Sequence, residues 1–119
     1  MGPLRGSPEK QKMQVTPMTV KVTGETFKSE VHESLLPVLV EFYASWCGKC
    51  AMMEDVVAEF AVENAERIKV CQIDTDQNKN LAAEFGVKKV PTFVSFRAGS
   101  PVRTVEGVVT GKVLGRLFE

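Results

Sequence analysis

Two short runs of almost continuous apolar and β-branched residues constrain this chain most: "VLVEFY" at 38–43 and "IKVCQID" at 68–74. Strands with this pattern are buried on both faces, which is typical of a sheet covered by helices on both sides. Between the two runs, residues 47–64 carry apolar side chains at helical spacing. A strand, a helix and a second strand in this order predict a parallel pair with a right-handed crossover.

The rest of the chain continues this alternation. Phe27, Val31 and Leu35 recur at helical spacing after a first strand at 18–23. Asn78 is predicted to begin a short helix that Gly86 ends. The last segments predict a hairpin of strands at 92–96 and 102–106, joined by the turn "RAGSP", and then a weak helix at 111–119. The whole order predicts an α/β fold of three layers, in which a central mixed, largely parallel sheet has helices on both faces.

The composition narrows the classes of partner. The 119 residues, of which 44% are hydrophobic and 25% charged, suffice for one domain with one core. Fifteen basic and fifteen acidic side chains cancel, so we expect neither nucleic acid nor a membrane as a partner. No apolar run approaches the ~18 residues that a membrane span needs. We expect a monomer.

The N-terminal stretch, residues 1–17, differs from the rest because it is polar and rich in Gly, Pro, Lys and Gln. We predict a tail there that is either disordered or vector-derived, as its opening "MGPLRGS" suggests, and a domain at 18–119. The tail has no apolar core of a signal peptide, so we expect a cytoplasmic location, although a targeting segment removed earlier would change this expectation.

The motif "WCGKC" at 46–50 places two cysteines three residues apart. Structural zinc needs four nitrogen or sulfur ligands. Besides Cys47 and Cys50, the chain offers a distant Cys71 and one histidine, His32, so a zinc site is disfavoured. A purely structural disulfide is also disfavoured, because the pair closes too small a loop to add much stability.

A reversible redox couple fits the spacing better. Residues three apart at a helix start bring their Cα atoms to roughly 5–6 Å, within disulfide range. Unpaired N–H groups and the helix dipole should lower the pKa of Cys47, which makes it the nucleophile. Cys50, one turn further on, is expected to be more buried and to resolve the mixed disulfide. The redox-active Cys47–Cys50 disulfide would then replace any bound cofactor.

Several segments together resemble the thioredoxin family from about Thr19 to Phe118: "VEFYASWCGKC", "IDTDQN", "LAAEFGV", "VPTFVSF" and the glycine of "EGVVT". The first segment also resembles the catalytic domains of protein disulfide isomerases. The resemblance implies a thioredoxin-like fold, reduction of protein disulfides, and regeneration by an NADPH-dependent thioredoxin reductase. Two alternatives stay open: an extracytoplasmic oxidase, isomerase or reductase of the same fold, and a redox-inactive binding adaptor.

The resemblance also implies roles for individual residues. Cys47 attacks, Cys50 resolves, and Trp46 packs beside them. The Val90–Pro91 bond is cis, with Pro91 facing the cysteines. The implied substrate-binding residues are Gly48, Lys49, Val90, Gly107 and Val108.

Four further positions carry an acid, an amide, a lysine and a third cysteine whose roles we interpret one by one. Glu41, an acid inside the buried strand, is expected to accept the proton of the resolving thiol. Thioredoxins usually have a lysine near this acid, where this chain has Gln72, so Glu41 should be easier to protonate. Lys49 stands where thioredoxins usually have proline, and its charge should stabilise a thiolate. Cys71 is predicted to be a small buried hydrophobic residue without a catalytic role.

Other polar residues receive structural interpretations. We expect His32 to be a solvated helix residue, and Asp74 and Asp76 to be loop and helix-capping residues.

Overall fold

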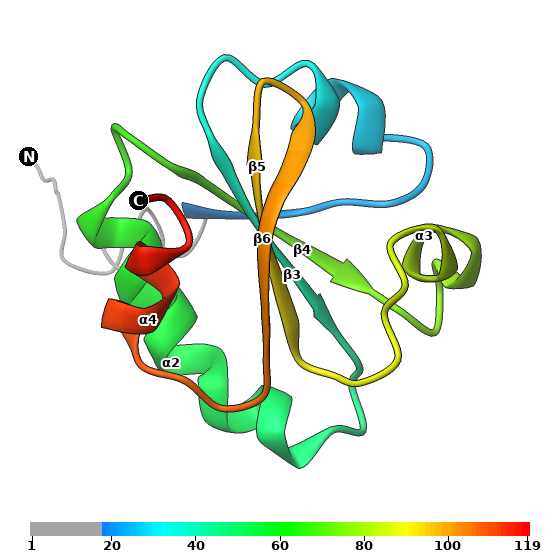
Figure 1. The fold of residues 1–119 in the computed structure, drawn as a ribbon. Helices are drawn as coiled ribbons and strands as arrows, with labels where there is room; N and C mark the ends of the chain where they lie inside the picture. The colour runs from blue at the N-terminus through cyan, green and yellow to red at the C-terminus, as the bar shows by residue number, and fades with distance from the viewer. Residues whose placement is uncertain (1–17) are drawn as a thin grey trace, which may run out of the picture.

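The computed structural model describes residues 18–119 (Figure 1). Residues 1–17, for which we predict a tail, lie outside the described residues. The order of elements confirms the predicted alternation. They are strand β2 (Thr19–Lys21), the π-helical turn η2 (Lys28–His32), strand β3 (Val38–Tyr43), helix α2 (Gly48–Glu63), strand β4 (Lys69–Asp74), helix α3 (Lys79–Glu84), strands β5 (Thr92–Arg97) and β6 (Ser100–Glu106), and helix α4 (Gly111–Arg116).

The five strands form one mixed sheet in the order β2-β4-β3-β5-β6. The central strand β3 pairs in parallel with β4 and antiparallel with β5. Strand β2 adds in parallel to β4, and β6 adds antiparallel to β5. Two of the four strand pairs within residues 18–119 are therefore antiparallel. The sheet has fewer parallel pairs than the sequence predicts, because β5, the first strand of the hairpin, pairs antiparallel with the central strand β3.

Helices cover both faces of the sheet, which confirms the three layers (Figure 1). Along β3, Val40 and Phe42 pack on the side of η2 and α3. Leu39 packs on the opposite side, against Met53 of α2 and Leu114 of α4. The run looks continuously apolar in the sequence because alternate residues of β3 are buried by different helical layers.

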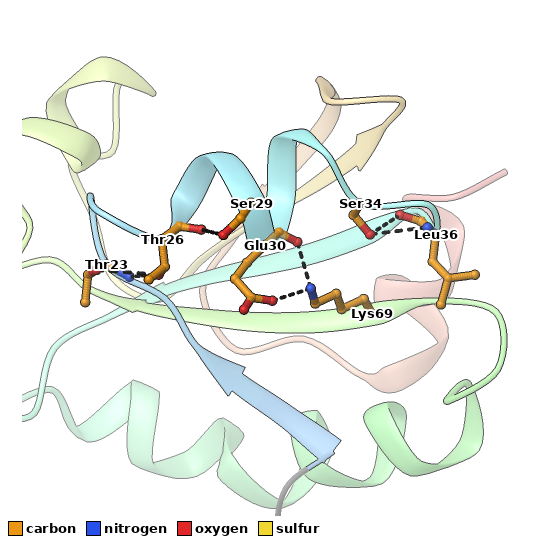
Figure 2. A network of polar contacts seen from close by, with 7 residues as sticks. All are labelled: Thr23, Thr26, Ser29, Glu30, Ser34, Leu36 and Lys69. Carbon is orange, nitrogen blue, oxygen red and sulfur yellow. Dashed lines mark hydrogen bonds and ion pairs between the residues drawn. The ribbon is translucent and has the colours of Figure 1, made fainter.

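The first helix is shorter than its apolar spacing predicts. The turn η2 ends at His32, and Leu35, expected on the apolar face, is fully exposed. The Ser34 hydroxyl donates to the carbonyl of Leu36 at 2.8 Å and accepts from its N–H at 3.2 Å (Figure 2). In addition, Pro37 disfavours a helical conformation at the residue before it. These two local effects end the helix before the apolar pattern does.

Three polar contacts fix η2 on the domain. The Nζ of Lys69, at the start of β4, donates to the backbone carbonyl of Glu30 at 2.9 Å and forms an ion pair with the carboxylate of the same residue (Figure 2). His32 Nδ1 lies 3.3 Å from the carbonyl oxygen of Gly99. Gly99 has a φ of +81°, and a Cβ there would lie 2.6 Å from the His32 carbonyl oxygen, so only glycine fits this hairpin turn.

Asn78 stands at the N-cap position of α3, as predicted, but its side chain does not cap the helix. Its Oδ1 accepts from the N–H of Gly24 at 3.0 Å, and its amide donates to the carbonyl of Asp74 at 3.0 Å. The side chain therefore connects two loops. Gly86, with a φ of +67°, follows α3 as expected.

Candidate functional site

The two cysteines lie where β3 gives way to α2, beyond the carboxyl ends of the parallel strands β3 and β4. Cys47 is the N-cap residue of α2, and its Sγ accepts a hydrogen bond from the N–H of Cys50 at 3.1 Å. Both side chains are free thiols in this structure. The helix start thus brings the two sulfurs together, as the spacing predicts.

The two thiols are almost equally buried, although the sequence predicts that Cys50 is the more buried of the two. Cys47 is 8% exposed and Cys50 is 6% exposed. Burial, assisted by the hydrogen bond with Cys47, raises the pKa of Cys50 to about 12. Cys50 is therefore protonated at neutral pH and needs a base before it can act as a nucleophile.

The Val90–Pro91 peptide bond is cis, which confirms the prediction. The Cys47 thiol donates to the carbonyl oxygen of Val90 at 3.4 Å, and Val90 packs against the small buried cluster of Ala44, Cys47 and Cys50. The loop before Pro91 therefore lies directly against the cysteine pair.

Trp46 and Cys47 line the same surface pocket, and Trp46 is 70% exposed. Its indole N–H donates to the Asp76 carboxylate at 2.7 Å. Asp74 shapes this loop by accepting from the N–H of Asp76 at 2.9 Å. The interpretation of Asp76 as a simple loop residue was incomplete. Thirty positions separate it from Trp46, and no sequence pattern indicates the contact.

Glu41 lies on the same face of β3 as Leu39, the face that α2 covers, and it is only 3% exposed. The amide of Gln72 on β4 donates to its Oε1 at 2.9 Å. Burial raises the pKa of Glu41, and the Gln72 hydrogen bond and the charge of Lys21 oppose this rise in part. A pocket of about 750 Å³ is lined by Glu41 and by both cysteines, so the acid and the thiol pair share one space.

Lys21 is a residue that the sequence analysis missed. It pairs with Gln72 across β2 and β4, and Gln72 pairs with Glu41 across β4 and β3, so the three form one row across the sheet. The Lys21 ammonium lies 4.5 Å from the centre of the Tyr43 ring and lines the pocket of Glu41. Gln72 supplies no cation to Glu41, as expected, but Lys21 of the neighbouring strand β2 does, and its charge opposes the rise in the pKa of Glu41.

The remaining predicted site residues lie around Cys47 and Pro91. Gly48 and Lys49 form the exposed first turn of α2. Gly107, at a φ of +90°, donates its N–H to the carbonyl of Pro91 at 2.9 Å, and Val108 beside it is 48% exposed. The contact of these residues with a substrate stays a prediction.

Neither a cluster of metal ligands nor a membrane-spanning helix occurs in the described part of the chain. Within residues 18–119, no group of three or more His, Cys, Asp or Glu side chains is placed to hold a metal ion. No helix of the same residues combines the length and apolar composition of a membrane-spanning segment. Cys71 is fully buried on the η2 side of the sheet, and burial raises its pKa to about 12.

Two neighbouring thiols can form and break a disulfide reversibly, so this α/β fold and its cysteine pair define a thiol–disulfide oxidoreductase. Comparison with known proteins gives the family. The thioredoxin family profile matches residues 18–118. The chain is 42% identical to Thioredoxin 1 of Synechococcus elongatus over 98 residues, which cover 82% of this chain and 92% of that protein. It is 48% identical to the thioredoxin of Pyropia yezoensis over 94 residues, 79% of this chain and 88% of that one.

The chain belongs to the thioredoxin family. It is a protein-disulfide reductase, and members of this family carry no bound cofactor. The chain is also 40% identical over 90 residues to a bifunctional thioredoxin reductase/thioredoxin of Mycobacterium leprae, which covers 76% of this chain and 20% of that protein.

Proposed function

We propose that Cys47 attacks substrate disulfides and that Cys50 resolves the mixed disulfide. The observation that carries this assignment is the placement of Cys47 at the N-cap of α2, where its sulfur accepts the N–H of Cys50 at 3.1 Å. A hydrogen bond donated to sulfur, together with the positive end of the helix dipole, favours a thiolate. Cys50 is not suited to the first attack, because burial raises its pKa to about 12 and keeps it protonated.

The proposed cycle transfers two electrons to the substrate. The Cys47 thiolate attacks one sulfur of the substrate disulfide, a Cys47–substrate bond forms, and the other substrate sulfur leaves as a thiolate. The Cys50 thiol then loses its proton and attacks Cys47 Sγ. The mixed disulfide breaks, the second substrate thiolate leaves, and the Cys47–Cys50 disulfide remains. The substrate is reduced and this chain is oxidised.

Glu41 is the base that we assign to the second step. Burial raises the pKa of Glu41, so a proton taken from Cys50 is held more strongly than by a solvated acid. The shared pocket of about 750 Å³ gives room for a water molecule between acid and thiol.

A thioredoxin reductase that uses NADPH is the proposed electron donor. The relative from Mycobacterium leprae carries both names in one chain, which supports a reductase as the partner of this domain. Protein disulfides are the proposed acceptors. The cytoplasmic location and the monomeric state stay predictions.

Reduction of insulin disulfides by NADPH and thioredoxin reductase tests these roles. We expect Cys47→Ser to abolish turnover, because no nucleophile remains. Cys50→Ser should also stop turnover but accumulate mixed disulfides with substrate, which mass spectrometry detects under non-reducing conditions. If Cys47→Ser were the variant that accumulates mixed disulfides, the two roles would be reversed.

A further inference from the structure

A second pocket, of about 510 Å³, opens beside Cys47. Trp46 and Val90 contribute to its apolar lining, and three lysines, Lys49, Lys88 and Lys89, line it as well. We call this pocket the lysine groove. Lys49 comes from the first turn of α2, whereas Lys88 and Lys89 come from the loop before Pro91, so two separate segments bring like charges together.

The lysine groove has no acidic residue in its lining. The first turn of α2 carries no acid either, and neither of the two ion pairs found within residues 18–119 involves a groove lysine. Asp76 touches the groove through Trp46, because one of its carboxylate oxygens accepts the indole N–H of that residue. Because the whole chain has a net charge of zero, the excess of positive charge in the groove is local.

The position of the groove decides what it can act on. Cys47 forms part of its lining, so the polypeptide that presents a disulfide to Cys47 must lie in or across it. An extended chain advances about 3.3 Å per residue, so residues within two positions of the target cysteine lie within about 7 Å of the attacked sulfur. That distance is shorter than the screening length of physiological salt, about 8 Å.

We propose that the lysine groove selects disulfide substrates whose target cysteine is flanked by acidic residues. This inference rests on the proposed attack by Cys47. Clusters of one charge at a binding site raise the association rate of oppositely charged partners and disfavour partners of like charge. The occupant is thus an extended, acidic polypeptide segment that carries a disulfide.

Two synthetic peptides that differ only in the flanking residues test the inference. Each forms a mixed disulfide with a small neutral thiol, and two Glu flank the cysteine in one and two Lys in the other. We expect the wild-type protein to reduce the Glu peptide roughly tenfold faster at low ionic strength. The ratio of the two rates should fall towards one as salt is added, because the lysines are exposed.

Charge reversal in the groove sharpens the test. The double variant Lys88→Glu, Lys89→Glu should lower the ratio to about one or invert it. Its matched control, Lys28→Glu with Lys112→Glu, makes the same change of net charge at exposed lysines outside the groove and should keep the wild-type ratio. Taking the ratio within each variant cancels a general change in activity.

Each contrary outcome has a distinct meaning. Equal rates for both peptides with the wild-type protein overturn the inference while leaving the proposed function intact. An equal effect of the control double variant shows that only net charge matters and overturns it too. If the wild-type protein reduces neither peptide, nor insulin, nor the neutral 2-hydroxyethyl disulfide, the proposed function itself fails.

Discussion

The two pockets beside the cysteine pair differ in charge, in burial and in which sulfur they reach. The first, of about 750 Å³, contains the buried acid Glu41 and is lined by both Cys47 and Cys50. The lysine groove, of about 510 Å³, carries solvated cations and is lined by Cys47 alone of the pair. Cys47 lies at the boundary between them, whereas Cys50 contacts only the acidic side.

This difference separates two tasks that a thiol–disulfide exchange needs. Proton transfer requires a group whose pKa is shifted by burial, and such a group must stay away from bulk water. Substrate recognition requires exposed groups that meet a partner from solution. Glu41 and the groove lysines line different pockets, and neither ion pair of residues 18–119 joins them. Substitutions on each side should therefore affect different steps.

The largest effect is expected from the acidic side. Glu41→Ala removes the proposed base for Cys50, so resolution of the mixed disulfide should slow by about a hundredfold, at the low end of general base catalysis. Formation of the mixed disulfide should change less, because Glu41 is assigned to the proton of Cys50 and not to that of Cys47. Single-turnover kinetics with a trapped mixed disulfide separate the two steps. Equal slowing of both would contradict the division between the pockets.

The pH dependence of stability gives an independent check on Glu41. Burial raises the pKa of Glu41 in the folded protein above its ordinary value of 4.5, so the folded chain binds this proton more tightly than the unfolded chain. Stability is then lost as the pH rises from about 4.5 through the folded pKa. Glu41→Gln removes this loss. Urea unfolding should show a gain at pH 8 that disappears at pH 4, and a gain of equal size at both would show that ionisation is not its cause.

On the groove side, Lys49 should also tune the redox potential. Its charge lies one turn or less from both sulfurs and favours the reduced, thiolate-containing form over the neutral disulfide. Because the side chain is exposed, we expect Lys49→Pro to lower the potential by only about 20–30 mV, or ~1 kcal/mol. Equilibration against glutathione measures it.

Lys49→Gln separates the charge from the backbone effect of proline. The same fall in potential in both variants would assign the effect to the charge. An unchanged or higher potential in Lys49→Gln would show that the ammonium group is solvated and has no influence on the couple.

A smaller effect is expected from Lys21, which lies two strands away from Glu41. Lys21→Met should raise the pKa of Glu41 further and slow resolution at neutral pH by roughly threefold, or ~0.7 kcal/mol. Gln72→Lys, which brings a cation next to Glu41, should move the pH profile of resolution in the opposite direction. Lys28→Met is the control, because Lys28 is exposed on η2. Identical pH profiles for all three variants would exclude a role for the Lys21 charge.

The parts of the fold that local pattern determines were predictable. The buried runs at β3 and β4 and the apolar spacing of α2 predict a covered sheet, and the helix start after β3 predicts that Cys47 and Cys50 lie together. The cis bond at Val90–Pro91 was predictable only from the family resemblance. Its local sequence carries no such signal, since few bonds before proline are cis.

What sequence reasoning missed depends on contacts between distant segments. Lys21 reaches the site because β2 joins the sheet beside β4. The residues of a single strand do not determine the order of the strands in a sheet. The contact from Trp46 to Asp76 likewise spans two loops. The error at Leu35 has a different origin: the Ser34 turn and Pro37 override an apolar spacing that continues past the end of the helix.

The smallest effect on activity is expected from the third cysteine, which reaches neither pocket. Cys71 is fully buried among apolar side chains on the opposite face of the sheet, and its pKa of about 12 keeps it protonated and unreactive. Cys71→Ala should leave insulin reduction near the wild-type rate and cost ~1 kcal/mol of stability through a small cavity. Activity and urea unfolding are measured on the same preparation. Loss of most activity in a variant that still unfolds cooperatively would show that the opposite face of the sheet affects the cysteine pair. The separation of tasks between the two pockets would then be incomplete.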